Sequence, residues 1–419
     1  MQRVVVTGIG ALTAIGNSVP DYLEGLRQGR SGAGPITQFD PENFKTKFAC
    51  EVKDWDPTLR LDKREVRRQD RYTQMALYTA DEALEMAGLL DDEHNPKGLD
   101  GDRAGCIWAS GIGGLRSLEE QIEIFEQGDG TPRYNPFMIP RMIANMGAGH
   151  ISMRYGLRGP SYATVSACAS AGHALAAAAD DIRLGRADVM VTGGSEAVIT
   201  KVAIGGFNNM KALSTRNEDP AAASRPYDAN RDGFVLGEGA GALVLESLEH
   251  AQARGATILA EVAGYAASSD AYHISAPHPE GVGAKLAMEN ALKYAGLAPT
   301  DVDYINTHGT STPLGDTAEL KAIQLAFGEA VYDLNISSTK SMTGHLLGAA
   351  AAIEAIACIL AIREGFAPPT INHETADPDI DPKLNLTLNA AQDRPIRTAL
   401  SNTFGFGGHN SATIFRAFS

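Results

Sequence analysis

Two stretches far apart in the chain share one pattern, a short strand followed by a tight turn and an alanine-rich helix. The first runs from Ser161 to Gly185 and the second from Asn335 to Gly365. The segments Val4 to Gly16 and Ala260 to Ser269 also resemble each other, since both begin as apolar strands with a glycine turn. Such wide spacing far exceeds the roughly 20–50 residues of a solenoid unit. We therefore expect two similar halves that meet near residue 250 and bring equivalent turns together.

The strands expected in both halves are continuous apolar runs. Such runs are typical of strands covered on both faces, as in parallel α/β sheets. Segments 73–87 and 169–184 have the apolar spacing of helices. The pattern predicts an α/β fold with residues 1–250 and 251–419 as its two halves. The clearest runs are Val4–Val6, Gly105–Ala109, Val189–Val191 and Ala242–Leu245.

Composition excludes several classes of protein. Of the 419 residues, 44% are apolar, which is enough to bury a core without disulfides or a structural metal. Lys and Arg number 36 against 51 Asp and Glu, a net charge of −15, so we do not expect binding to nucleic acid or to an anionic membrane surface. The longest apolar stretch, Leu346 to Ile362, contains Glu354 and is shorter than the roughly 20 residues of a membrane span.

The cysteines and the N-terminal segment bear on the cellular compartment. The four cysteines form no C-x-x-C pair, so a zinc ribbon, a redox motif and a disulfide framework are not expected. The chain begins with a strand-like segment and shows neither a secretory signal nor a transit segment. We expect a protein of the reduced cytoplasm. The cysteines are Cys50, Cys106, Cys168 and Cys358.

Cys168 is the first candidate for chemistry. It lies where a strand over 162–166 turns into a helix, among Ala, Ser and Gly residues that leave room for a substrate. A thiol at a helix N-terminus is close to unsatisfied N–H groups, which favour the thiolate. The alternative is a small buried thiol in an alanine-rich core, as expected for Cys358.

Two histidines strengthen the catalytic interpretation. His308 stands in N-T-H-G-T-S-T-P and His345 in S-S-T-K-S-M-T-G-H, each in a turn after an apolar strand. Catalytic side chains commonly project from such turns. A metal site could use both histidines, but no carboxylate or thiol stands at a ligand spacing such as H-E-x-x-H. His173, five residues after Cys168 on the same helix, is expected in the core.

A glycine-rich segment near the C-terminus is a third candidate. Residues 401–410 read S-N-T-F-G-F-G-G-H-N. They could form only a hairpin turn, or they could bring a backbone N–H to a developing oxyanion, because glycine permits close approach and unusual φ. Nucleotide-binding fingerprints are absent: the turn Gly8-x-Gly10 has Thr13 in place of a third glycine, and there is no Walker A pattern.

Together these motifs resemble those of the β-ketoacyl-acyl-carrier-protein synthases. The resemblance rests on T-x-x-A-C-A-S around Cys168, N-x-H-G-T-S-T-P-x-G-D around His308, the segment ending at His345, and N-x-F-G-F-G-G near the C-terminus. Segments 212–217 (A-L-S-T-R-N) and 231–241 (R-D-G-F-V-L-G-E-G-A-G) are most similar to the type II elongating enzymes. The resemblance covers essentially the whole chain. It implies a thiolase-like fold, with duplicated halves in a layered α-β-α-β-α arrangement.

The resemblance implies a decarboxylative Claisen condensation of malonyl-carrier with acyl-carrier protein, giving 3-oxoacyl-carrier, CO2 and free carrier. Cys168 would hold the acyl chain as a thioester. His308 and His345, as neutral imidazoles, would hydrogen-bond the malonyl thioester and stabilise its enolate. The N–H groups of Cys168 and Phe406 would meet the oxyanion, and the Phe406 side chain would gate entry.

Supporting residues implied by the resemblance surround that centre. Lys340, paired with Glu319, would orient it electrostatically. No cofactor is implied beyond a structural monovalent cation, which would also give buried Glu354 a partner. The implied cation ligands are Asn306, Glu354, Ser401 and Asn402, and the implied acyl pocket is lined by Ile112, Phe207, Thr310, Thr312 and Phe404.

Acyl carrier protein is the implied partner, and the family implies a homodimer. Because the carrier is strongly acidic, an acidic enzyme needs a local basic patch. Segment 60–71 has six basic and three acidic residues, although an ordinary charged helix face would look the same. The implied docking residues are Arg64, Arg67, Arg68, Arg133 and Lys211.

Related activities differ from this one in single features. A degradative thiolase needs a second cysteine near the C-terminus, an initiating synthase has Asn where His345 stands, and a noncatalytic scaffolding partner lacks the nucleophile. A cysteine hydrolase would need water access that a deep acyl tunnel denies. A type I elongating ketoacyl synthase is the nearest alternative, since acyl preference alone separates it. The chain departs from the family pattern at His409, often Thr, and in segment 91–101, which is longer than usual.

Overall fold

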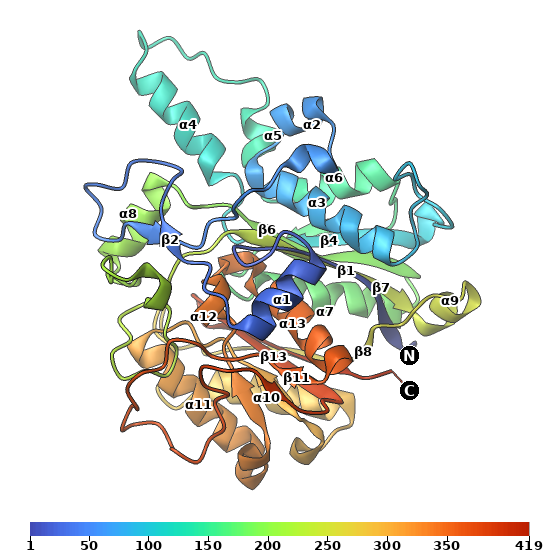
Figure 1. The fold of residues 1–419 in the computed structure, drawn as a ribbon. Helices are drawn as coiled ribbons and strands as arrows, with labels where there is room; N and C mark the ends of the chain where they lie inside the picture. The colour runs from blue at the N-terminus through green and yellow to red at the C-terminus, as the bar shows by residue number, and fades with distance from the viewer. Residues whose placement is uncertain (419) are drawn as a thin grey trace.

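Ten strands form one hydrogen-bonded mixed sheet, whose two ends lie on either side of central helices (Figure 1). The computed structural model describes residues 1–418. The strand order is β10-β9-β13-β14-β8-β1-β7-β6-β4-β5, and two small sheets, β2-β3 and β11-β12, lie outside it. The strands are β1 Val4–Leu12, β2 Gly34–Pro35, β3 Phe48–Ala49, β4 Ala104–Ala109, β5 Ser161–Thr164, β6 Val189–Glu196, β7 Gly239–Ser247, β8 Ala260–Ser269, β9 Tyr304–Asn306, β10 Asn335–Ser337, β11 Phe366–Ala367, β12 Gln392–Asp393, β13 Thr398–Gly405 and β14 His409–Arg416.

The ten-stranded sheet consists of two matching sets of five strands. Outward from β1 the order is β7, β6, β4, β5, with two antiparallel pairings followed by two parallel ones. Outward from β8 the order is β14, β13, β9, β10, with the same sequence of directions. The sets meet only through β1 and β8, where Val5 pairs with Glu261 and Val6 with Ala260. The duplicated α/β fold is therefore confirmed, while the exact division at residue 250 stays a prediction.

The expectation of a parallel sheet is wrong for part of each half. β7 and β14 run antiparallel to both of their neighbours. Nearly all of their residues are nevertheless buried, because helices cover the sheet on both faces. A continuous apolar run reports burial of both faces and carries no information about the direction of the neighbouring strand.

Helices complete a five-layer α-β-α-β-α arrangement, as Figure 1 shows. Helices α7 and α13 contact each other and strands of both sets, so they form the middle layer. Helices α3 and α6 cover the outer face of the first set, and α10, with α11 packed on it, covers the second. The layer helices are α3 Arg71–Met86, α6 Met146–Tyr155, α7 Ser170–Arg183, α10 Val282–Ala295, α11 Pro313–Phe327 and α13 Ala350–Glu364.

The middle layer explains the alanine-rich composition of the two repeated helices. In α13 every residue from Ala350 to Ala361 is buried, including Glu354. A helix that is apolar on all sides is a core helix, and small alanine side chains let α7, α13 and both sheets approach closely. The predicted helix over 169–184 and the predicted apolar stretch over 346–362 thus correspond to the centre of the molecule.

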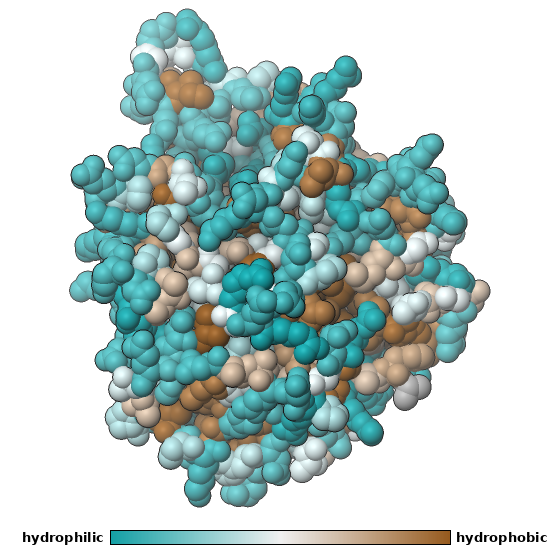
Figure 2. All heavy atoms as spheres, in the orientation of Figure 1, coloured by the Kyte–Doolittle hydropathy of each residue, from teal (hydrophilic) through white to brown (hydrophobic). Residues whose placement is uncertain are grey.

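All but one of the remaining helices lie on the periphery. The short helix α2 and the helix α4 lie at the top of the view in Figure 1, and Figure 2 shows hydrophilic side chains covering most of this face. All four cysteines are buried and unpaired. Among residues 1–418, no helix is long and apolar enough to cross a membrane. The peripheral helices are α1 Val19–Gln28, α2 Lys63–Arg68, α4 Leu115–Glu126, α5 Met138–Met142, α8 Lys201–Asn209 and α9 Leu248–Ala253, whereas the short helix α12 Lys340–Thr343 is buried.

Candidate active site

Cys168 lies in the tight turn between β5 and α7. Ala167, just before it, has a left-handed backbone with φ of 50°, an uncommon conformation for a residue with a Cβ. The hydroxyl of Ser170 holds this turn, because it accepts from the N–H of Ser166 and donates to the carbonyl of Ala167. His173, expected in the core, is instead half-buried, and its Nδ1 lies 2.7 Å from Ser166 Oγ.

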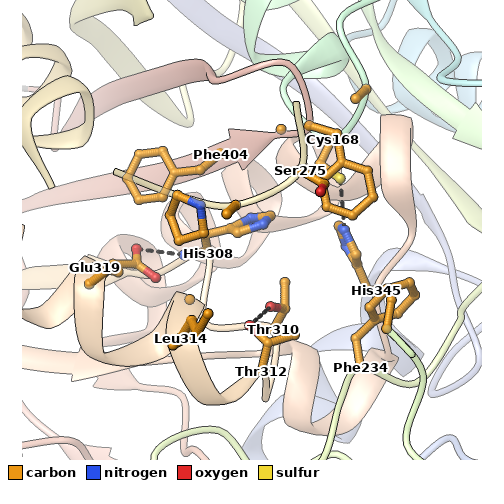
Figure 3. Close-up of a pocket in the computed structure, with 18 of the residues that line it drawn as sticks. Cys168, Phe234, Ser275, His308, Thr310, Thr312, Leu314, Glu319, His345 and Phe404 are labelled. Atoms are coloured by element: carbon orange, nitrogen blue, oxygen red, sulfur yellow. Dashed lines mark hydrogen bonds between the residues drawn. The ribbon is translucent and has the colours of Figure 1, made fainter. Parts of the chain in front are cut away.

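The two candidate histidines converge on this thiol from the second half. His345 Nε2 lies 2.9 Å from Cys168 Sγ, as the dashed line in Figure 3 shows. The rings of His308 and His345 are 5.3 Å apart between centroids and nearly perpendicular. His308 follows β9, whereas His345 follows α12. The predicted grouping of one cysteine and two histidines is therefore present in space, although more than a hundred residues separate Cys168 from either histidine in the chain.

The protonation states in this site follow from burial and one nearby cation. Desolvation and the positive charge of Lys340 both lower the pKa of His308 and of His345 well below its usual value, so the rings are neutral at pH 7. Desolvation raises the pKa of Cys168 to about 12 despite the positive charge of Lys340. The expected thiolate is therefore not the resting form. The helix N-terminus favours it, but loss of hydration has the larger effect.

The sequence leaves open a metal site that uses His308 and His345, and the structure adds Cys168 to this pair. The three donor atoms lie within 4.8 Å of one another, so the third ligand that the sequence spacing lacked is supplied in space. However, sulfur and nitrogen ligands of a tetrahedral zinc stand about 3.5 Å apart, given metal bonds of about 2.3 and 2.0 Å. The 2.9 Å between Sγ and His345 Nε2 is shorter than that and fits a hydrogen bond.

Lys340 has a different partner from the one expected. Its ammonium group forms a buried ion pair with Glu354 on α13, not with Glu319. Glu319 on α11 instead accepts hydrogen bonds from the backbone N–H groups of His308 and Gly309, at 2.8 and 2.7 Å. Desolvation raises the pKa of Glu319 to about 7. Glu319 thus holds the His308 turn, while Lys340 and Glu354 place a neutralised charge pair behind both histidines.

The implied cation ligands do not all face one point, because Ser401 and Asn402 are neighbours on β13 and their side chains point to opposite faces of the strand. The Asn402 amide contacts Met288 and Glu319, whereas Glu354 lies on the other face, beside Thr403. Among the described residues, Asn306 Oδ1, Ser401 Oγ and Asn402 Oδ1 are buried and have no hydrogen-bond partner. Neutral oxygen atoms of this kind suit a hard cation. Glu354 does not need such an ion for charge compensation, however, because its carboxylate faces Lys340. The expectation that the cation is the partner of Glu354 is therefore corrected.

The glycine-rich segment is both a hairpin and a wall of the site. It connects β13 to β14, and Gly407 and Gly408 have positive φ values of 87° and 76°. The backbone N–H of Phe406 is close enough to the sulfur of Cys168 to lower the pKa of its thiol, against the larger effect of burial. A Cβ at Gly405 would lie 2.8 Å from the carbonyl of Ser166, so only glycine allows the hairpin to approach this closely. Both readings of the sequence motif are compatible with the structure.

A cavity of about 710 Å³ opens onto Cys168. Figure 3 shows that Thr310, Thr312 and Leu314 lie on one side of it, and that Phe404 lies beside His308, with 5.8 Å between ring centroids. The structure brings every expected pocket residue to this cavity. Those residues are Ile112, Phe207, Thr310, Thr312 and Phe404, and Phe406, the expected gate, also lines the cavity.

One wall of the cavity was not anticipated from the sequence. Residues 275–278, together with Asp270, line it. This segment reaches the hairpin, because Gly407 N–H donates to the carbonyl of Ile274 at 2.7 Å and Asp270 N–H to that of Gly408 at 2.9 Å. The only sequence signal is the concentration of His, Ser and Pro after β8, which by itself reads as an ordinary loop.

The expected docking residues do not lie on one continuous patch. Arg64, Arg67 and Arg68 are exposed on α2, whereas Lys211 lies at the cavity after α8, and Figure 1 shows α2 and α8 well apart. Arg133 is exposed in the loop before α5 and pairs with Asp129. Two further arginines of the predicted patch, at positions 60 and 71, are engaged with buried carboxylates.

Family comparisons agree with this geometry. The family model of the β-ketoacyl synthase N-terminal domain matches residues 1–251, and that of the C-terminal domain matches residues 259–374. The chain belongs to the β-ketoacyl synthase family. It is an acyltransferase-class condensing enzyme with a thiolase-like fold.

Two relatives match this β-ketoacyl synthase over nearly their whole length. The 3-oxoacyl-[acyl-carrier-protein] synthase 2 of Synechocystis is 48% identical over 417 residues, covering all of this chain and 98% of the relative. The protein of the same name from Coxiella burnetii is 46% identical over 413 residues, covering 99% and 98%.

Solved structures of ketosynthases show the same fold. A β-ketoacyl synthase from Burkholderia phymatum superposes with a TM-score of 0.91 at 34% identity, covering both chains completely. A type II polyketide ketosynthase, solved in complex with its acyl-carrier protein and bound to a hexaketide, has a TM-score of 0.90 at 35% identity, again with full coverage.

Proposed function

We propose that this β-ketoacyl synthase, an elongating condensing enzyme of fatty acid synthesis, joins a malonyl unit to an acyl chain through an acyl-Cys168 intermediate. The observation that carries the proposal is the contact between His345 Nε2 and Cys168 Sγ inside a cavity that also contains neutral His308. The products are 3-oxoacyl-carrier, CO2 and free carrier. The 3-oxoacyl-carrier synthases that are nearly half identical over the full chain support this reaction class.

The first step transfers the acyl chain from its carrier to the enzyme. Cys168 Sγ attacks the thioester carbonyl, and its proton passes to His345 Nε2 at 2.9 Å. The N–H groups of Cys168 and Phe406 support the oxyanion. Collapse breaks the carbon–sulfur bond to the carrier, whose thiolate takes the proton back from His345. The step consumes no net proton and leaves a thioester on Cys168.

The second step forms the carbon–carbon bond. Loss of CO2 from the malonyl thioester leaves its bonding electron pair as an enolate, whose oxygen accepts N–H hydrogen bonds from neutral His308 and from neutral His345. His345 donates here as the tautomer with its proton on Nε2, which forms when its imidazolium gives up its Nδ1 proton at the end of the first step. The enolate carbon attacks the acyl-Cys168 carbonyl. Collapse then releases Cys168 as a thiolate, and its high pKa ensures that it takes up one proton from solvent.

This reaction requires no redox or electrophilic cofactor. Lys340 and Glu354 act behind the histidines, where burial and, to a smaller extent, the ammonium charge lower the pKa of both rings and keep them neutral. A structural monovalent cation would be held by the unpartnered side-chain oxygens of Asn306 and Ser401, which pair in register on β9 and β13, and would satisfy these buried oxygens. The side chain of Asn402, another implied ligand, faces away from them. The cation has no part in the bond-making steps.

Acyl carrier protein is the proposed partner, docking through Arg64, Arg67, Arg68, Arg133 and Lys211. A related ketosynthase has been solved with its own acyl-carrier protein, which supports this choice. We also propose a homodimer, because β5 is an end strand of the sheet with exposed Tyr162. The four unpaired cysteines support the reduced cytoplasm as the compartment.

Intact-mass measurement after incubation with a long-chain acyl-carrier substrate tests the proposal. We expect one acyl group on the wild-type chain and none on Cys168→Ala, followed by discharge when malonyl-carrier is added. Wild-type protein that is folded but takes up no acyl group would reject the acyl-enzyme mechanism. Acylation that persists in Cys168→Ala would reject the assignment of the nucleophile.

A further inference from the structure

The cavity beside Cys168 has walls from both halves of the chain. Ile112, just after β4, comes from the first half, and Leu347, just before α13, comes from the second. The backbones of the two segments touch next to these residues, since a Cβ at Gly348 would lie 2.1 Å from the backbone nitrogen of Gly111. The space available to an acyl chain therefore depends on how these two segments are placed relative to each other.

One buried carboxylate holds both segments. Glu196, the last residue of β6, is fully inaccessible to solvent. Its Oε2 accepts from the N–H groups of Gly111 at 2.7 Å and Gly348 at 3.0 Å. Its Oε1 accepts from Ser110 Oγ at 2.9 Å and from the N–H of Ile112 at 3.3 Å. Four donors from two segments converge on a single side chain, and the proposed catalytic steps do not use it.

The backbone of the second segment needs such support. Leu347 has a φ of 47°, in the left-handed region that residues with a Cβ seldom adopt. The next residue, Gly348, donates to Glu196. A strained residue keeps its conformation only where its surroundings hold it, and here that hold includes a hydrogen bond to the carboxylate.

We propose that Glu196 is a positioning residue for the acyl pocket, which sets the chain-length preference of the enzyme by fixing Ile112 against Leu347. The proposal rests on the function proposed above. Glu196 acts through backbone N–H groups and does not touch the reacting atoms. Because its oxygens accept from both halves, loss of one acceptor frees one wall of the pocket while the catalytic turns at His308 and His345 keep their own contacts.

Glu196→Gln makes a specific and limited change. The amide oxygen can keep the bonds to Gly111 and Gly348, and the amide nitrogen can donate to the hydroxyl of Ser110. The N–H of Ile112 then faces an N–H group and loses its acceptor. The variant is therefore expected to fold, with the wall that carries Ile112 less firmly placed.

The test measures acylation of Cys168 by intact mass with carriers that bear short, medium and long acyl chains. For Glu196→Gln we expect the ratio between the best and worst chain length to fall about tenfold. The rate of malonyl decarboxylation should stay within about twofold of wild type, because the histidine turns are not altered. Glu82→Gln is the matched control, since Glu82 is also buried and accepts from the N–H groups of Ala11 and Val19 away from the cavity.

The outcomes separate this inference from the proposed function. A chain-length profile that is unchanged in Glu196→Gln, with wild-type acylation intact, overturns the positioning role and leaves the function standing. Absence of acylation in wild type overturns the function itself.

A second variant tests whether Glu196 acts through Ile112. Ile112→Ala should flatten the chain-length profile to a similar extent, and combining it with Glu196→Gln should flatten the profile little further. Fully additive effects of the two substitutions would contradict action through Ile112. If Glu196→Gln does not fold, Ser110→Ala removes one donor to the carboxylate, and an unchanged profile there also overturns the proposal.

Discussion

At the scale of single residues, Cys168 experiences two opposing effects. The start of α7 favours a thiolate, while complete burial favours the neutral thiol and raises its pKa to about 12. His345 Nε2 at 2.9 Å then becomes necessary, because the proton has to leave as the sulfur attacks. A neutral, buried thiol beside a neutral imidazole also avoids a buried charge in the resting enzyme.

We predict that alkylation of Cys168 by iodoacetamide becomes faster with pH up to at least pH 9. The reason is that the thiol pKa lies near 12, so the thiolate fraction grows about tenfold for each pH unit below that value. The rate is followed by intact mass, with Cys168→Ala as the control for reaction at other cysteines. A plateau below pH 7.5 would mean that the helix N-terminus outweighs burial.

The Lys340–Glu354 pair allows a second test at this scale. Lys340→Met removes the cation and leaves a buried carboxylate, which is expected to lower the free energy of unfolding by about 3–5 kcal/mol. Adding Glu354→Gln should restore most of that loss, whereas adding Glu319→Gln should not. Urea denaturation measures all three variants. Restoration by the Glu319 change instead would support the pairing expected from the sequence.

At the scale of elements, helix α2 is the clearest candidate surface for an acidic partner. Asp62 and Glu65 form a capping box at its start, so its acidic residues serve the helix N-terminus. Arg64, Arg67 and Arg68 remain exposed, and Arg68 lies 5.6 Å from the ring of Phe137 before α5. These three cations are available to carboxylates of a carrier, unlike the arginines at positions 60 and 71.

We predict that Arg67→Glu combined with Arg68→Glu weakens carrier binding at least about tenfold at low ionic strength. The effect should shrink near 0.5 M salt, because exposed charges are then screened within a few ångströms. Fluorescence anisotropy of a labelled carrier gives the affinity, and Lys293→Glu on α10, also exposed, is the control. Equal carrier affinities of the wild type and of the Arg67→Glu, Arg68→Glu variant would reject α2 as a docking element.

At the scale of the whole molecule, the matching sets of strands place equivalent turns around one cavity. The first half contributes Ile112 and Cys168, which face the acyl chain, and the second contributes His308, His345 and Phe406. The end strands of the sheet are not equivalent, however. Residues of β10 are buried, while β5 is partly exposed and leads into Val165, which is 60% exposed. An open strand edge with apolar side chains favours association.

We predict a dimer in solution that uses β5. Light scattering on a sizing column should give twice the mass of the chain, and Val165→Arg should shift the species toward monomer, because a charge would be buried at the contact. Tyr294→Arg on α10, a similarly exposed apolar residue, should leave the mass unchanged. A monomeric wild type, or a dimer unaffected by Val165→Arg, would contradict the prediction.

The sequence by itself determined the features that depend on local chemistry. Apolar runs, glycine turns and alanine-rich segments marked β4, β6, α7 and α13, because burial and turn conformation are written into neighbouring residues. The repeat indicated two halves. The motifs around Cys168, His308 and His345 indicated that these side chains belong to one site. In the structure His345 Nε2 lies 2.9 Å from Cys168 Sγ, and the two histidine rings are 5.3 Å apart between centroids.

Only the tertiary structure decided which groups meet across the two halves. Lys340 faces Glu354 and not Glu319, β7 runs antiparallel to its neighbours, and Glu196 holds segments more than two hundred residues apart. The protonation of Cys168 likewise depends on burial. These properties follow from distances and from loss of hydration inside the folded chain, and neither quantity is set by residues that are adjacent in sequence.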